Sequence, residues 1–186
     1  MPTIPLAPEI TYLSIPDYES IERWKVFTNT RYNYEIKYPN LAEYEAKVSE
    51  EFPTAQTNLL VIFKSKEYYV GNKKIFPWVI YLNANLQKIN FDDAPDFYTN
   101  IQNSLNYFNK AHNYGLRIID ERLIGSKKMI IVSNNASNTK NLIMYATIEK
   151  DKSSYMEIRA ESIAGGNTEN YKKFFMQFIS TFKLNE

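Results

Sequence analysis

The chain has 186 residues, of which 44% are hydrophobic and 15% aromatic, and this is sufficient for one globular domain with its own core. Its 22 basic and 21 acidic residues nearly cancel, which argues against a nucleic-acid backbone or an anionic membrane surface as the partner. The absence of cysteine excludes disulfides, thiolate metal sites and cysteine nucleophiles.

Residues 1–23 are predicted to form an extended N-terminal arm, and residues 24–186 the single folded domain. Proline has no amide hydrogen to donate and biases the preceding residue toward extended backbone. Four prolines recur in the arm: Pro2, Pro5, Pro8 and Pro16. Two interpretations stay open. The arm is either a tether left after an export signal is removed, or an edge segment that lies on the domain.

Residues 24–39 are typical of an aromatic-rich β-hairpin. A polar Asn/Thr turn separates its two strands. In the second strand Tyr32, Tyr34, Ile36 and Tyr38 alternate with polar residues, so one face is expected to be buried and the other solvated.

The next segment, residues 41–52, is predicted to be a short helix, with a loop containing one turn as the alternative. Asn40 can cap it and Pro53 can end it. Its apolar residues recur at near-helical spacing: Leu41, Tyr44, Val48 and Phe52.

Two strands are predicted next, at residues 58–65 and 76–83, from their β-branched and aromatic content. Tyr68–Val70 is expected to extend the first of them or to pair with it. Pro77 suggests that the second strand begins at a sheet edge. Residues 83–91 are interpreted as a polar loop.

A helix capped by Asp92 or Asp93 is predicted to follow, with Pro95 in its first turn. Asn113 and Gly115 are expected to end it. Its apolar stripe covers about three turns and consists of Phe97, Ile101, Leu105 and Phe108.

The remaining sequence predicts consecutive antiparallel strands and a final helix. The strands are separated by short polar turns and cover residues 116–124, 127–133, 141–150 and 154–162. The final helix carries an apolar stripe made of Tyr171, Phe174, Phe175, Phe178, Ile179 and Phe182. With roughly seven strands and two or three helices, the fold class is α+β, a central antiparallel β-sheet flanked by helices.

Candidate reactive residues are few, and the sequence assigns no catalytic, cofactor-binding or metal-binding residue. The lone histidine, His112, is interpreted as a helix-terminal residue placed near the helix dipole. The acids Asp92, Asp93 and Asp96 lack the spacing and glycine of a calcium loop. Serines have only that histidine as a base, and no phosphate-binding loop is present.

Three further sequence patterns do not identify a site. Asp120 and Glu121 are neighbours in a predicted strand, so they point to opposite faces and cannot form one acid–base pair. Lysines interleave with tyrosines in residues 64–74, which we interpret as a solvated hairpin edge instead of a single-stranded nucleic-acid platform. Asn135-Ala136-Ser137 is a glycosylation sequon.

Three segments resemble the PsbP-like family, which includes the extrinsic photosystem II protein and many bacterial exported relatives. FTNTRYNYEIKYP at 27–39 resembles the opening hairpin of the family, DDAPDFYTNIQNSLNYF at 92–108 its middle helix, and YKKFFMQFISTFKL at 171–184 its terminal helix. The resemblance implies an α/β/α sandwich around a central antiparallel sheet. It also implies a protein that is usually exported and usually not an enzyme.

The functional expectation is therefore a non-enzymatic binding or assembly module, exported to the cell surface as a lipoprotein or secreted. Its partner would be a protein or cell-envelope component, with no nucleic acid, no cofactor, and membrane contact only through an N-terminal lipid anchor. One alternative is a hydrolase or lyase with an acidic and tyrosine-lined cleft, recognisable by two acids and a raised carboxyl pKa. The other is a cytosolic chaperone or adaptor with an exposed aromatic groove.

Overall fold

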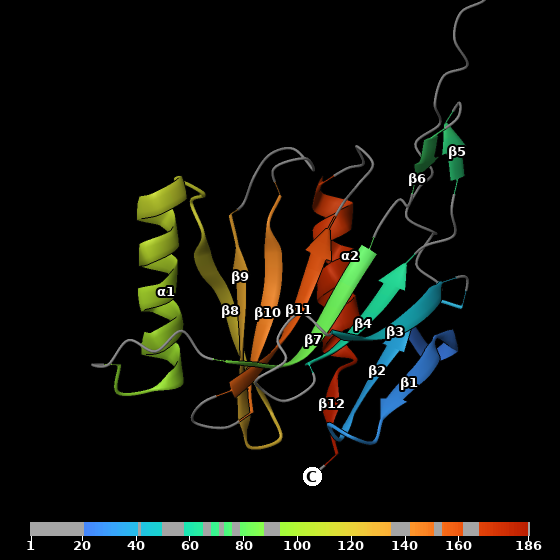
Figure 1. The fold of residues 1–186 in the computed structure, drawn as a ribbon, viewed down its shortest axis with the longest axis horizontal. Coiled ribbons are helices and arrows are strands. Elements are labelled where there is room, and N and C mark those ends of the chain that lie inside the picture. The colour runs from blue at the N-terminus through green and yellow to red at the C-terminus, as the bar shows by residue number, and fades with distance from the viewer. Residues whose placement is uncertain are drawn as a thin grey trace, which may run out of the picture.

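The centre of the fold is a seven-stranded antiparallel sheet with the strand order β3-β4-β7-β11-β10-β9-β8 (Figure 1). The computed structural model describes residues 21–40, 42–49, 58–64, 68–70, 73–75, 79–87, 94–134, 142–150, 154–161 and 168–185. In sheet order the strands are β3 (Glu43–Ser49), β4 (Asn58–Lys64), β7 (Val79–Gln87), β11 (Ser154–Glu161), β10 (Met144–Glu149), β9 (Lys127–Ser133) and β8 (Arg117–Ile124).

The predicted hairpin at the start of the domain is confirmed. Strands β1 (Lys25–Asn29) and β2 (Tyr34–Tyr38) pair antiparallel, and the alternate residues Tyr34, Ile36 and Tyr38 are buried. Asn29 fixes the turn, because its side-chain oxygen accepts hydrogen bonds from two backbone amides of the turn at 3.0 Å each. The short strand β12 (Lys183–Leu184) pairs with β2 and completes a three-stranded sheet.

Helix α2 (Thr168–Ser180) covers one face of the central sheet, and its predicted stripe is buried. Phe174 and Phe178 contact Trp24, with ring centroids 6.0 and 6.4 Å apart respectively, and Phe178 meets Phe63 of β4 edge-on at 5.2 Å. Such aromatic contacts add to the free energy gained by burying apolar area. The prediction that the terminal helix docks on antiparallel strands is confirmed.

Helix α1 (Phe97–His112) lies beside β8 and β9, away from α2 (Figure 1). A second apolar cluster lies beneath it, separate from the α2 cluster, and contains Phe97, Ile101, Leu105, Leu116, Ile130 and Val132. Ile130 and Val132 alternate in β9 with Met129 and Ile131, which belong to the α2 cluster. The two clusters therefore lie on opposite faces of the sheet, and the predicted α+β sandwich is confirmed.

The helix predicted at residues 41–52 is wrong, because Glu43–Ser49 forms strand β3. Tyr44, Ala46 and Val48 also alternate with polar residues, so the segment fits a strand as well as a helix. A seven-residue ladder with β4 pairs its backbone, whereas a helix of this length has little stability of its own. Pairing with the next strand along the chain overrides the local preference.

Other predicted boundaries also differ from the structure. Tyr68–Val70 forms β5 and pairs with β6 (Lys73–Ile75), not with β4. β7 continues to Gln87 through part of the predicted loop, because β11 pairs with it up to that residue. The described residues contain twelve strands instead of roughly seven.

Helix α1 begins later than predicted. Asp96 is its N-cap, and the Asp96 side chain accepts a hydrogen bond from the Thr99 amide at 2.8 Å. Pro95 therefore precedes the cap instead of lying in the first turn, and Asp92 and Asp93 fall outside the described residues. At the other end Asn113 adopts the left-handed conformation, with φ of 54°. Most of the predicted arm lies outside the described residues; its last part, Ile21–Arg23, is a 3₁₀ turn.

Candidate functional site

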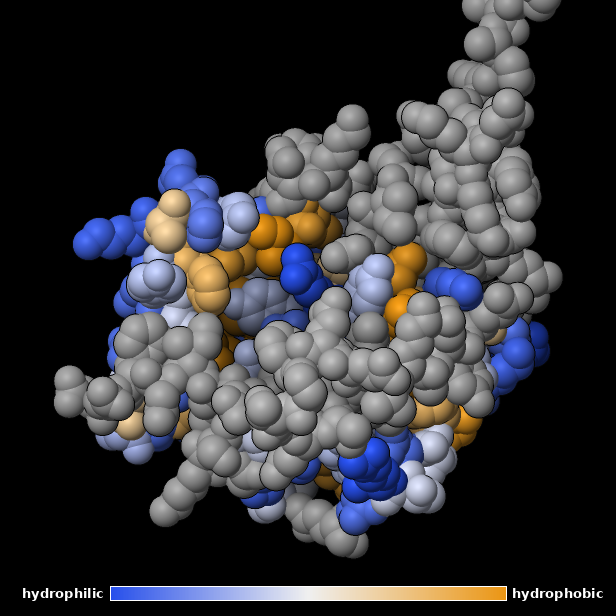
Figure 2. Space-filling view, in the orientation of Figure 1, coloured by the Kyte–Doolittle hydropathy of each residue, from blue (hydrophilic) through white to orange (hydrophobic). Residues whose placement is uncertain are grey.

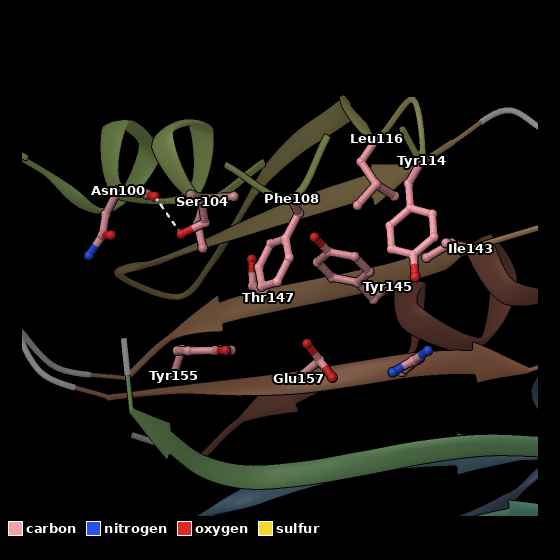
Figure 3. Close-up of a pocket in the computed structure, with 12 residues that line it drawn as sticks. Asn100, Ser104, Phe108, Tyr114, Leu116, Ile143, Tyr145, Thr147, Tyr155 and Glu157 are labelled. Carbon is pink, nitrogen blue, oxygen red and sulfur yellow. Dashed lines mark hydrogen bonds between the residues drawn. The ribbon is translucent and has the colours of Figure 1, made fainter. Parts of the chain in front are cut away.

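A cavity of about 240 Å³ lies between α1 and the central sheet. On this side of the molecule apolar side chains gather around a hollow beside α1, with hydrophilic side chains next to them (Figure 2). Figure 3 shows the lining residues, which come from α1, the segment after it, β10 and β11. They are Asn100, Ile101, Ser104, Phe108, Tyr114, Leu116, Ile143, Tyr145, Thr147, Tyr155, Glu157 and Arg159.

The floor of the cavity is built by alternation along β11. Met156, Ile158 and Ala160 point into the core under α2, so the residues between them point toward α1. These residues are Tyr155, Glu157 and Arg159.

Strand β10 supplies the other half of the floor. Tyr145 lies opposite Arg159 in the antiparallel ladder, and Thr147 lies opposite Glu157. Directly opposed side chains on one face are close enough to interact. The charged residues of β11 therefore have a hydroxyl-bearing neighbour on β10.

The roof is formed by helix α1 and the turn after it. Asn100, Ser104 and Phe108 recur every four residues and therefore share one face of the helix. Asn109 fixes the returning chain: its side chain donates to the carbonyl oxygen of Leu116 and accepts from the Leu116 amide, both at 2.7 Å. Gly115, with φ of 65°, provides the turn between Tyr114 and Leu116.

Three aromatic rings stack along the roof. The ring of His112 lies nearly parallel to those of Phe108 and Tyr114, at 22° to each, with centroids 6.5 and 5.1 Å away. His112 is exposed and does not line the cavity itself. Its ring supports two rings that do.

Among the described lining residues Glu157 is the only acidic one, and it is half-buried. Burial raises the pKa of its carboxyl group above the ordinary value, because water solvates a charge better than the cavity wall does, and the nearby charge of Arg159 opposes this shift. Within the described part of the chain, the Glu157 carboxyl forms no hydrogen bond or ion pair. Arg159 is exposed.

The two tyrosines of the floor keep their hydroxyl protons. Burial, with a smaller contribution from the charge of Glu157, raises the pKa of Tyr155 to about 12. The same two causes raise the pKa of Tyr145 above its ordinary value. Both hydroxyl groups are therefore neutral hydrogen-bond donors at physiological pH.

Asn100 contributes a polar group without a partner. The residue is 7% exposed, and its side-chain oxygen has no hydrogen-bond partner among the described residues. Ser104 donates to the backbone oxygen of Asn100 at 2.9 Å and not to the side-chain oxygen. Because unpaired buried polar groups cost free energy, this oxygen is available to a ligand that donates a hydrogen bond.

The residues considered from the sequence do not come together. His112 ends α1, and Asp96 caps it, where hydrogen bonds from Thr99 lower the pKa of the carboxyl. Asp120 pairs with Arg122 at 2.7 Å and Glu121 with Lys128 at 3.6 Å, as expected for solvated strand charges.

The remaining candidates give no site. No cluster of three or more metal-ligating residues is found in the part of the chain that the structure describes, and within it no helix is long and apolar enough to cross a membrane. The sequon at 135–137 and Ser137 lie outside this part. Residues 68–70 and 73–75 of the lysine and tyrosine segment form the β5–β6 hairpin.

Sequence reasoning missed the cavity. The alternation in residues 154–162 predicts two faces, and the sequence pattern assigns the face of Tyr155, Glu157 and Arg159 to solvent. Two tyrosines and one glutamate on neighbouring strands were the available signal. The hydrolase alternative anticipated a tyrosine-lined cleft with a raised carboxyl pKa, and the cavity has this feature, but the lining contains one acid where two were expected.

The sequence matches no family model and no curated protein. Among solved structures, the chain is similar to the solution structure of cyanobacterial PsbP (CyanoP) from Synechocystis sp. PCC 6803. The TM-score is 0.47 and the identity 12%, and the match covers 86% of this chain and 91% of that chain.

Proposed function

We propose that this protein is a non-enzymatic binding module that holds a small molecule in the cavity between α1 and the sheet. The observation that carries the proposal is the lining itself: apolar and aromatic walls surround a few polar groups, and two of those, Glu157 and Asn100, have acceptor oxygens without a partner among the described residues. Ligand pockets are typically built this way. At about 240 Å³ the cavity suits a molecule smaller than a typical drug.

Binding accounts for the cavity better than catalysis does. Hydrolysis or elimination by paired carboxyl groups needs one acid and one base on either side of the reacting bond. Here Glu157 is the one acidic residue in the part of the lining that the structure describes, and the neighbouring tyrosine hydroxyls hold their protons too strongly to act as bases at neutral pH.

The proposal includes export, with residues 1–20 as a tether to the cell surface and a protein or cell-envelope component as the further partner. It is supported by the resemblance of the three sequence segments to a family of exported proteins and by the four prolines of the arm. Cell fractionation of the native organism tests this part, and recovery of the protein in the cytosolic fraction alone would contradict it.

The binding function is tested by blocking the cavity. Thermal-shift measurements against a set of small cations, anions, zwitterions and neutral molecules should find compounds that raise the melting temperature, because a ligand that binds only the folded state stabilises it. Ser104→Leu adds apolar volume to the roof and should abolish the shift. Ser180→Leu makes the same change at an exposed site on α2 and should preserve it.

Mass spectrometry of the incubated compound separates binding from catalysis. Recovery of the unchanged compound supports a binding module. Turnover of the compound by the wild type, with loss of turnover in Ser104→Leu, would assign the cavity to an enzyme. If none of the compounds shifts the melting temperature, the cavity is not a ligand site.

A further inference from the structure

We infer that the ligand of the cavity is a small zwitterion with an apolar body, that is, an amino acid with an apolar side chain or a compound of the same chemistry. This inference rests on the proposed binding function and specifies its ligand. Three properties of the lining point to such a ligand: its charges, its acceptors without a described partner, and its apolar surface.

The charges of the lining are one negative and one positive side chain. Glu157 and Arg159 are two positions apart on the same face of β11, so they are separated by about 6.6 Å along the strand. A single small molecule can contact both. A ligand that carries an ammonium group for Glu157 and a carboxylate for Arg159 complements this pair, whereas a simple cation or anion satisfies one charge and faces the like charge of the other.

The different depths of Glu157 and Arg159 in the cavity set the orientation of the ligand. Asn100 and Ser104 are buried, whereas Tyr114 is 46% exposed and Arg159 is exposed, so the cavity opens toward the latter two. The ligand carboxylate would lie at this opening. Its ammonium group would lie deeper, at Glu157.

Hydrogen-bond acceptors at depth favour an amine that still carries N–H groups. The Glu157 carboxyl and the Asn100 side-chain oxygen are both acceptors without a partner in the described part of the chain. A primary ammonium group has three donors and can satisfy acceptors from two sides. The rings of Tyr145 and Tyr155 add a surface that attracts a cation.

The rest of the lining is apolar. Ile101 and Phe108 from α1, Leu116 after it, and Ile143 before β10 form walls with no charge to pair. These walls favour a hydrocarbon side chain over a second polar group. A charged or strongly polar amino acid would lose solvation there without compensation.

Three probes with the same hydrocarbon tail separate these contributions. Leucine carries both charged groups, 3-methylbutylamine lacks the carboxylate, and 4-methylpentanoate lacks the amine. We expect a saturable change in the ¹H–¹⁵N spectrum with leucine, at amides of α1 and β11. The amine should bind at least threefold more weakly than leucine, and the acid at least tenfold more weakly.

Two variants assign the charges. Glu157→Gln should weaken leucine binding at least tenfold. Arg159→Gln should reduce the affinity for leucine to that for the amine, without weakening amine binding. Glu121→Gln removes the same charge from the exposed strand β8 and should bind leucine as the wild type does. A dispersed, wild-type-like spectrum of each free variant shows that it is folded.

The zwitterion inference fails if 4-methylpentanoate binds as tightly as leucine, or if Glu157→Gln retains leucine affinity. It also fails if leucine does not bind while a neutral or purely anionic compound does, and Ser104→Leu abolishes binding of that compound. In that case the proposed binding function stands, but with another class of ligand. If no compound of any class binds, both the inference and the proposed function fail.

Discussion

At the scale of single residues, Glu157 carries the most information. It lies on β11 between two residues that point into the core under α2, Met156 and Ile158, and it faces the cavity instead. A half-buried carboxyl without a hydrogen bond destabilises the folded state when it is ionised. Proteins tolerate such a group where it serves a ligand, so its cost to stability is measurable.

Glu157→Gln should stabilise the free protein at neutral pH. The pKa of Glu157 is raised in the folded state, so the folded protein holds this proton more tightly than the unfolded chain. The stabilisation that comes from this tightly held proton is therefore fully present below the pKa of the unfolded chain, which is about 4.3. It is lost as the pH rises through the pKa of the folded protein. We expect the variant to melt roughly 2 °C higher than wild type at pH 7.5 and at the same temperature near pH 3.5.

Calorimetric melting curves at several pH values measure this difference. Glu121→Gln, at an exposed position, serves as the matched charge removal and should change the melting temperature by less than about 1 °C. A lower melting temperature for Glu157→Gln at pH 7.5 would show that the carboxylate has a stabilising partner, which would contradict its role as an open acceptor.

At the scale of elements, helix α1 connects stability to the site. Its apolar residues Phe97, Ile101 and Leu105 hold it on the sheet, and its polar positions Asn100 and Ser104 form the roof of the cavity. The apolar stripe could be predicted from the sequence because helical spacing is a local property. The cavity could not be predicted, because it depends on which strand face lies under the helix, and that is set by the order β11-β10-β9-β8.

Asp96→Ala should weaken helix α1 and, through it, the site. The Asp96 side chain satisfies the Thr99 amide, and loss of such a cap lowers the stability of the helix. For a chain of this size we expect the melting temperature to fall by roughly 2–4 °C, and amide exchange to increase first at residues 97–101.

Asp96→Asn tests the cause. Asparagine also caps helices, so this variant should retain most of the stability. If Asp96→Asn loses as much as Asp96→Ala, the charge of the carboxylate, and not its hydrogen bond, stabilises the start of the helix.

At the scale of the whole molecule, the sequence predicted the fold class but not every element. Alternation in β2 and β11, and the phenylalanine stripe of α2, are strong local signals, and they sufficed for the sandwich. Residues 43–49 show why such signals are incomplete. This short segment fits both the helical and the strand periodicity, and its pairing with β4 determines that it forms a strand. Tyr145 and Glu157 are 12 positions apart, and only the ladder between β10 and β11 makes them neighbours in one site.

Deleting residues 1–20 should leave the melting temperature within about 2 °C of wild type. Among the described residues, the core contacts begin at Ile21 and Trp24, and Trp24 packs against α2 through Phe174 and Phe178. An arm that serves as a tether adds little apolar burial to this core. Differential scanning calorimetry of the shortened chain measures the change, and a decrease of 10 °C or more would make the arm part of the core.

The placement of two separate apolar clusters on opposite faces of one sheet has an evolutionary consequence. Substitutions at Tyr145, Thr147 or Phe108 alter the cavity under α1, while the larger phenylalanine-rich cluster under α2 stays unchanged. Distant, non-contacting substitutions have nearly additive effects. Descendants of this chain can therefore change what they recognise on one side while the other side keeps them folded.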